Sequence, residues 1–205
     1  NLFVICTGRS VDSVLEKLIE YQVPYDYIIG VNGAIAVNRE QSIMHAHAFD
    51  IESVNKIQHI LKNHDIVDYH LSNGLSHNLI LSGEELIDIN EIRGYYINAM
   101  TDEGALSLSE KLNISLNQVG IKAYPNDHFV AVGMRGINKG HGVKQLAEIL
   151  KWQGKIHVIG DDYNDIPMFE MFNSYGIKSG KPDAISHAKS QVDSVSEALE
   201  DILNK

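Results

Sequence analysis

The sequence predicts an α/β protein, a doubly wound parallel sheet with an inserted α+β module. Short continuous apolar runs, such as residues 2–6 and 155–160, are typical of parallel strands covered on both faces. Segments with helical spacing of apolar residues alternate with these runs, which favours a parallel sheet. Residues 50–126 instead mix short strands and helices. The predicted division is therefore a core of residues 1–49 and 127–205, and an inserted module of residues 50–126.

The elements expected in the core follow from apolar periodicity and turn signals. Ser10 is expected to cap the first helix, because serine is a preferred N-cap residue, and Pro24 to follow its end. Strands are expected at residues 2–6, 27–31, 129–134, 155–160 and 174–177, and a hairpin at 34–37 and 43–49. Helices are expected at residues 11–21, 138–150, 165–173, 182–189 and 195–203.

The inserted module carries weaker signals. Helices are expected at residues 51–62 and 106–112, with helical stretches within 84–99. Strands are expected at residues 70–76, 78–81 and 119–124.

Composition excludes several classes of protein. The 205 residues contain 17 Lys+Arg and 27 Asp+Glu, a formal charge of -10, which argues against a nucleic-acid-binding groove. No apolar run reaches the ~18 residues of a membrane helix, so no membrane partner is expected. The one cysteine, Cys6, cannot form an internal disulfide, so we expect a cytoplasmic protein.

The strongest chemical signal is the acidic cluster that follows residues 155–160. Gly160 ends the predicted strand, and Asp161, Asp162, Asn164 and Asp165 follow at once. Ligands of open α/β sheets bind beyond the carboxyl ends of the strands, and a hard cation offsets the repulsion between neighbouring carboxylates. Asp161 is the expected metal ligand. The alternative is a solvated acidic turn in which Asp162 or Asn164 caps the next helix.

Two other junctions between a strand and a helix carry residues suited to phosphate. The hydroxyl of Thr7 and the backbone N–H groups near Gly8 precede a predicted helix, where phosphate oxygens bind well. Lys139 lies at the start of the helix expected at 138–150 and would neutralise a phosphate or hold a nucleophile. Taken alone, the Thr7-Gly8 segment is also explained as a common turn after a strand, and Lys139 as an exposed lysine in a loop.

Together these residues resemble the haloacid dehalogenase superfamily of phosphatases, in particular its Cof-type branch (subfamily IIB, C2 cap). The second family motif matches Thr7-Gly8-Arg9, with Asn32-Gly33-Ala34 after the next strand, and the third matches Lys139-Gly140. The fourth motif, Gly-Asp-x-x-Asn-Asp, matches residues 160–165. The resemblance implies a Rossmann-like core and an inserted C2-type cap.

The resemblance also implies Mg²⁺-dependent hydrolysis of small phosphorylated metabolites, either sugar phosphates or phosphorylated cofactors, through an aspartyl-phosphate. It implies that Thr7, Gly8, Lys139 and Asn164 bind phosphate, with Thr7 and Lys139 taking part in catalysis. Asp161 would bind Mg²⁺. Asp165 and Asp162 would support these groups from close by. No motif identifies the substrate, and the sequence gives no basis for choosing among cap residues such as Tyr124.

The first family motif, Asp-x-Asp-Gly-Thr, is missing, because no aspartate here has a second aspartate two residues later. We therefore expect the attacking aspartate upstream of residue 1, and these 205 residues alone to be inactive. The alternative is a catalytically inactive protein of the same fold that binds a phosphate ligand or has a regulatory role. The sequence does not indicate the oligomeric state.

Overall fold

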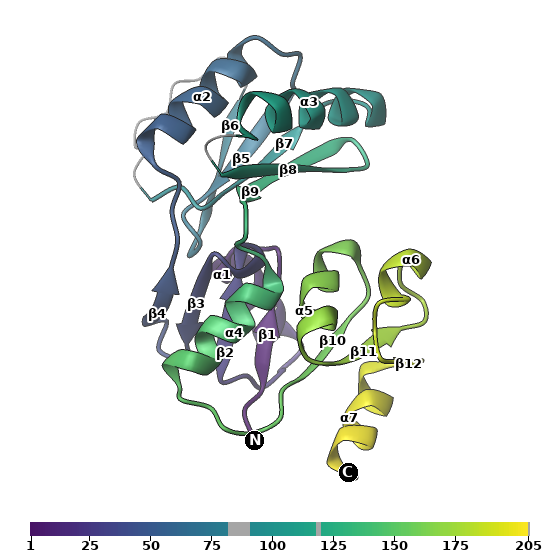
Figure 1. Ribbon diagram of the computed structural model, residues 1–205. Helices are drawn as coiled ribbons and strands as arrows, with labels where there is room; N and C mark the ends of the chain where they lie inside the picture. The colour runs from purple at the N-terminus through teal and green to yellow at the C-terminus, as the bar shows by residue number, and fades with distance from the viewer. Residues whose placement is uncertain (82–90, 118–119, 205) are drawn as a thin grey trace. The chain divides into compact units, whose positions relative to one another are not determined.

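The computed structural model describes residues 1–81, 91–117 and 120–204 (Figure 1). The chain folds as two compact units, Asn1–Ile137 and Asn138–Lys205, each described by itself below. Within the described residues no helix is long and apolar enough to cross a membrane.

The first unit begins with a four-stranded sheet of order β1-β2-β3-β4. Strand β1 pairs with β2 in parallel, as expected, and β2, β3 and β4 follow as antiparallel neighbours. Helix α1 packs Val11, Val14 and Leu18 against this sheet. The elements are β1 (Val4–Cys6), α1 (Val11–Glu20), β2 (Tyr27–Gly30), the 3₁₀ turn η1 (Val31–Gly33), β3 (Ile35–Asn38) and β4 (Ile43–Ala46).

The same unit continues with a five-stranded antiparallel sheet of order β6-β5-β7-β9-β8. Helices α2 and α3 cover one face of it, and their apolar side chains form a buried cluster with alternate residues of the strands (Figure 1). The elements are α2 (Ile51–Lys62), β5 (Asp68–Ser72), β6 (His77–Leu81), β7 (Gly94–Asn98), α3 (Asp102–Ser115), β8 (Ile121–Asn126) and β9 (Phe129–Met134).

Two expectations for this sheet are wrong. Residues 129–134, expected as a core strand, form β9 and pair with β7 and β8 in the five-stranded sheet. Residues 94–98, expected within helical stretches, form β7 because both neighbouring strands supply backbone partners. Residues 84–90 of that expectation lie outside the described residues, since 82–90 are not described.

The turn between β5 and β6 contacts the start of α1. The N–H groups of Val11 and Asp12 donate to the carbonyl oxygens of Gly74 and Leu75, at 2.9 and 2.8 Å. Leu75 packs against the apolar cluster of α1 and its sheet. Ser10 holds the N-cap position of α1, but its side chain makes no capping hydrogen bond. The expectation that Ser10 caps the helix is therefore wrong, because carbonyl groups of a distant turn take that place.

The second unit contains a parallel three-stranded sheet of order β10-β11-β12 with short helices around it. Residues 165–173, expected as one helix, contain the last residue of the 3₁₀ turn η3, the shorter α5 and the first residue of β11. Residues 182–189 form only the four-residue α6, and β12 was not expected. The elements are α4 (Lys139–Ile149), β10 (His157–Gly160), η3 (Tyr163–Asp165), α5 (Ile166–Met171), β11 (Asn173–Ile177), α6 (Pro182–Ile185), β12 (Ser190–Val192) and α7 (Val195–Leu203).

Candidate functional site

Thr7 and Gly8 lie in the first unit, directly after β1. The N–H of Thr7 donates to Ile29 O at 2.8 Å, which continues the pairing of β1 with β2. The Thr7 hydroxyl oxygen accepts from the N–H of Arg9 at 3.1 Å. Gly8 is exposed. The strand therefore ends in a short turn that fixes a hydroxyl and leaves an accessible backbone, a combination suited to phosphate oxygens.

The loop after β2 is held against this turn. Asn32 N donates to Thr7 O at 3.0 Å, and Val31 N donates to Arg9 O at 2.9 Å. Both Val31 and Asn32 have positive φ, at 49° and 52°, a conformation that is unfavourable for a β-branched residue such as valine. These hydrogen bonds stabilise the strained loop beside Thr7.

Lys139 and Asp165 form a buried ion pair in the second unit. Their charged atoms, Nζ and Oδ1, are 2.5 Å apart, and the residues are 7% and 2% exposed. Lys139 is the first residue of α4, which is capped by Asn138 through a hydrogen bond from His141 N at 2.9 Å. The pair refutes the alternative that Lys139 is an exposed lysine.

The second oxygen of Asp165 organises the acidic turn. Asp165 Oδ2 accepts from the N–H groups of Asp161 and Asp162, at 2.8 and 3.1 Å. Asp162 is the N-cap residue of η3, and its carboxylate accepts a hydrogen bond from Tyr163 N at 2.7 Å. Asp165 thus connects Lys139 to the backbone that carries Asp161.

Three glycines allow the close packing on which this arrangement depends. A Cβ at Gly160 would lie 2.4 Å from Asp165 Oδ2, and one at Gly140 would lie 2.5 Å from Pro167 O. A Cβ at Gly180 would lie 2.3 Å from Asp161 O, the oxygen that accepts from Lys181 N at 2.8 Å. Gly180 and Lys181 were not predicted from the sequence, because no motif links residues 180–181 to the acidic turn.

Asp161 differs from its neighbours because its carboxylate is exposed and makes no hydrogen bond or ion pair in the described part of the chain. Its backbone is fixed by Asp165 and Lys181. An oxygen donor held in this way fits Mg²⁺, which proteins bind through one or two carboxylates together with water and substrate phosphate. Residues 1–81, 91–117 and 120–204 contain no group of three or more His, Cys, Asp or Glu that could hold a metal ion by itself.

The structure thus brings Lys139, Asp161, Asp162 and Asp165 together in one unit. Asn164 lies in the same turn, in η3, with its side chain exposed. The Thr7 turn belongs to the other unit. The two parts offer different chemistry: hydroxyl and backbone donors around Thr7, and a cation beside carboxylates around Asp161.

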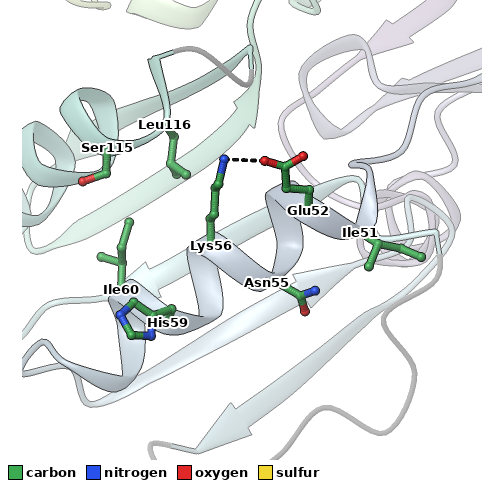
Figure 2. Close-up of a pocket in the computed structure, with 8 residues that line it drawn as sticks. All are labelled: Ile51, Glu52, Asn55, Lys56, His59, Ile60, Ser115 and Leu116. Carbon is green, nitrogen blue, oxygen red and sulfur yellow. Dashed lines mark hydrogen bonds and ion pairs between the residues drawn. The ribbon is translucent and has the colours of Figure 1, made fainter.

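A groove of about 620 Å³ on the helical side of the five-stranded sheet contains none of these residues (Figure 2). It lies between α2 and the end of α3, and its lining includes an ion pair along α2, Lys56 with Glu52 at 2.5 Å. Both partners of that pair are exposed, at 44% and 71%, so they are screened by solvent. This groove offers no chemistry related to the predicted site.

Another polar contact, between α1 and β6, was also not predicted. His77 Nδ1 lies 3.1 Å from the Ser10 hydroxyl and 3.5 Å from Asp12 Oδ1. Burial by itself raises the pKa of the Asp12 carboxyl, but hydrogen bonds from Ser10 and Ser13 N, together with His77, lower it below its ordinary value. No sequence signal was available, because Ser10 and His77 are 67 residues apart.

Comparison with known proteins gives a consistent result. The model of one family, described as haloacid dehalogenase-like hydrolase, matches residues 1–98 and 88–199. A protein of Mycoplasma capricolum subsp. capricolum (strain California kid) is 27% identical over 205 residues, covering 87% of this chain and 77% of its own length.

Solved structures share the fold. A haloacid dehalogenase-like hydrolase from Bacteroides thetaiotaomicron matches with a TM-score of 0.80 and 17% identity, over 97% of this chain and 85% of its own. The phosphatase BT1666 of the same organism matches at 0.76 and 22% identity, over 98% and 80%. The subclass IIB sugar phosphatase BT4131 matches at 0.70 and 18% identity, over 97% and 84%.

Proposed function

Because the chain belongs to the haloacid dehalogenase-like hydrolases, we propose that it is a Mg²⁺-dependent phosphatase of small phosphorylated metabolites. The observation that carries the proposal is the buried pair of Lys139 and Asp165 beside the exposed carboxylate of Asp161. The substrates proposed are sugar phosphates or phosphorylated cofactors, and the likeness to the sugar phosphatase BT4131 supports the first of these two classes. The composition supports a cytoplasmic setting.

Each residue has a role in the proposal. Thr7 and the backbone near Gly8 hydrogen-bond phosphoryl oxygens, and Asn164 supports phosphate from the acidic turn. Lys139, held in place by Asp165, supplies a positive charge to the reacting phosphate. Asp161 holds Mg²⁺, which when bound offsets the negative charge of the phosphate. Asp162 caps the turn that carries Asp161.

Hydrolysis through an aspartyl-phosphate is part of this proposal, and the attacking role is assigned to none of the 205 residues. The domain arrangement is likewise proposed: a core of residues 1–49 and 127–205, and a cap of residues 50–126. The exception is β9, residues 129–134, which pairs with β7 and β8 in the five-stranded sheet formed by the proposed cap. A catalytically inactive phosphate-binding protein of the same fold is the competing function.

The test is phosphate release by the full-length protein from a panel of phosphorylated metabolites, with Mg²⁺ and with EDTA. We expect release only with Mg²⁺, and its loss in Asp161→Ala. The matched control is Asp183→Ala, which removes another exposed carboxylate of the same unit. Calorimetric titration with Mg²⁺ gives a second readout, since binding by Asp161→Ala should be weaker. Undiminished release by Asp161→Ala would refute the metal assignment, and phosphate binding without release from any ester would favour the competing function.

A further inference from the structure

The five-stranded sheet has a second face, which points away from α2 and α3. Burial alternates along β5, β7 and β9, and the buried residues are those that face the helices. We call the other side the open face. The residues of the open face that matter here are His70, Tyr96, Lys122, Tyr124, Ala131 and Gly133.

Strand register aligns four of these residues across the sheet. His70 lies opposite Tyr96, Tyr96 opposite Ala131, and Ala131 opposite Tyr124. Two tyrosines therefore flank a small residue. Neighbouring strands are about 4.8 Å apart, so the backbones of Tyr96 and Tyr124 are separated by roughly 9.6 Å. Stacked aromatic rings have centroids about 4.5–7 Å apart, so this separation suits one flat ring above Ala131.

The space beside Ala131 is open at Gly133. A Cβ built at Gly133 would meet no heavy atom within 4 Å. Gly133 is also not among the glycines with positive φ, so its backbone does not require glycine. Glycine inside a strand often marks a place where a ligand approaches closely. Free space distinguishes Gly133 from Gly140 and Gly160, where a Cβ would lie 2.5 and 2.4 Å from the nearest atom.

The tyrosines on either side are exposed, and each contacts a neighbouring side chain. Tyr96 is 39% exposed and stacks on Phe129, with ring centroids 4.8 Å apart and planes at 18°. Tyr124 is 53% exposed, and Lys122 Nζ lies 5.7 Å from its ring centroid. Burial raises the pKa of the Tyr124 phenol, against the effect of the Arg135 charge, which lowers it.

The charge on this part of the open face is positive. Lys122 forms no ion pair with a carboxylate of the described residues, and the Arg135 charge is close enough to act on Tyr124. In a protein of net charge -10, a local positive charge of this kind favours an anionic ligand such as a phosphate ester. His70, which lies opposite Tyr96, has an Nδ1 that is buried with no hydrogen-bond partner among the described residues.

The open face adjoins the loop that holds Thr7. A Cβ at Gly94, on β7, would lie 2.6 Å from a methyl carbon of Val31. Val31 and Asn32 donate backbone hydrogen bonds to Arg9 and Thr7. The sheet and the predicted phosphate-binding turn are thus separated by a single loop within one compact unit.

We infer that the open face binds the organic part of the phosphate ester, and that this part contains a planar aromatic ring lying over Ala131 and Gly133 between Tyr96 and Tyr124. The inference rests on the proposed function for the phosphate but assigns a site and a substrate class of its own. It favours phosphorylated compounds with an aromatic ring, such as nucleotides or pyridine derivatives, over sugar phosphates without one.

The test is binding by the full-length protein of adenosine, uridine and pyridoxine, which carry purine, pyrimidine and pyridine rings but no phosphate. Ligand-detected NMR and calorimetry report binding without requiring catalysis.

Gly133→Val fills the open space and adds a residue with high strand propensity, so we expect it to fold and to weaken binding at least 10-fold. Tyr124→Ala should weaken binding about 10-fold through lost stacking. The matched control, Gln191→Val, places valine at an exposed strand position of the other unit and should bind as the unchanged protein does.

Kinetics with the phosphate esters of the same compounds, and with glucose 6-phosphate and glycerol 1-phosphate, separates this inference from the proposed function. Gly133→Val should raise KM for the aromatic esters and leave kcat/KM for glycerol 1-phosphate unchanged. Binding of none of the three ring compounds, or equal binding by Gly133→Val, would overturn the inference even if esters are hydrolysed. Absence of phosphate release from every ester, with ring binding still dependent on Gly133, would refute the proposed function and support the ring site.

Discussion

The ammonium of Lys139 lies 2.5 Å from the carboxylate of Asp165, and both side chains are more than nine-tenths buried. Because the other oxygen of Asp165 accepts two backbone N–H groups, one carboxylate serves the lysine and the acidic turn at once. The buried carboxylate of Asp165 therefore has three partners, and it fixes both the Lys139 side chain and the strand end that carries Asp161.

Loss of the Asp165 carboxylate is therefore expected to be severe. Asp165→Ala leaves the Lys139 charge buried without its partner and removes the acceptor of two N–H groups. Breaking a buried ion pair in this way costs about 3–5 kcal/mol. Urea denaturation of the full-length protein should show a decrease in the free energy of unfolding of that size.

The control for this prediction is an exposed ion pair of the same unit. Lys178 and Asp193 are 2.9 Å apart, with side chains 50% and 74% exposed. Asp193→Ala should change the free energy of unfolding by less than about 1 kcal/mol, because solvent screens exposed pairs. Equal losses in Asp165→Ala and Asp193→Ala would show that burial of the Lys139 pair is unimportant.

Gly140 is predicted to tolerate no side chain. A Cβ there would lie 2.5 Å from Pro167 O, a backbone atom that moves only if α4 and α5 separate. We expect Gly140→Ala to lower the free energy of unfolding by about 1–3 kcal/mol, the range found for overpacked sites. Thermal unfolding followed by circular dichroism measures this, with Gly133→Ala as the same substitution in open space. A higher stability of Gly140→Ala would contradict the predicted clash.

The residues of the acidic turn were predictable from the sequence because they are contiguous. A buried strand, a glycine and a group of acids fall within residues 155–165, and local order is enough to place their side chains at one strand end. Lys139 is 26 residues away from Asp165, so sequence spacing did not predict that the two lie together. That expectation came from the family resemblance.

Interactions between distant segments set the limit of prediction. Residues 94–98, Gly-Tyr-Tyr-Ile-Asn, carry a strand composition, but their neighbours gave no clear period, and the partners in β5 and β9 are remote in the chain. The apolar residues at 129–134 read as a core strand because pattern does not reveal which sheet a strand joins. The capping of α1 by Gly74 and Leu75 was unpredictable for the same reason.

The N-cap of α2 gives a prediction on a purely local interaction. The Asp50 carboxylate accepts from Ser53 N at 2.7 Å, and this hydrogen bond, with one from the Ser53 side chain, holds the pKa of Asp50 below its ordinary value. Asp50→Ala should lower the free energy of unfolding by about 1 kcal/mol, and Asp50→Asn by less, because asparagine also caps helices. Urea denaturation at neutral pH distinguishes the two. A larger loss in Asp50→Asn than in Asp50→Ala would argue against capping as the role of this side chain.

Asp12 gives a prediction on acid stability. Its pKa is lowered in the folded protein, where hydrogen bonds from Ser10 and Ser13 N, with the effect of His77, outweigh burial. A carboxyl with a lowered folded-state pKa stabilises the protein above its unfolded-state pKa, about 3.9, and this contribution is lost as pH falls through the folded-state value. Asp12→Asn should therefore be less stable than the unchanged protein at pH 7, and the difference should shrink below about pH 4. Urea denaturation at pH 7, 5 and 3 measures this, and a difference that persists undiminished at pH 3 would show that the Asp12 charge does not stabilise the contact between α1 and His77.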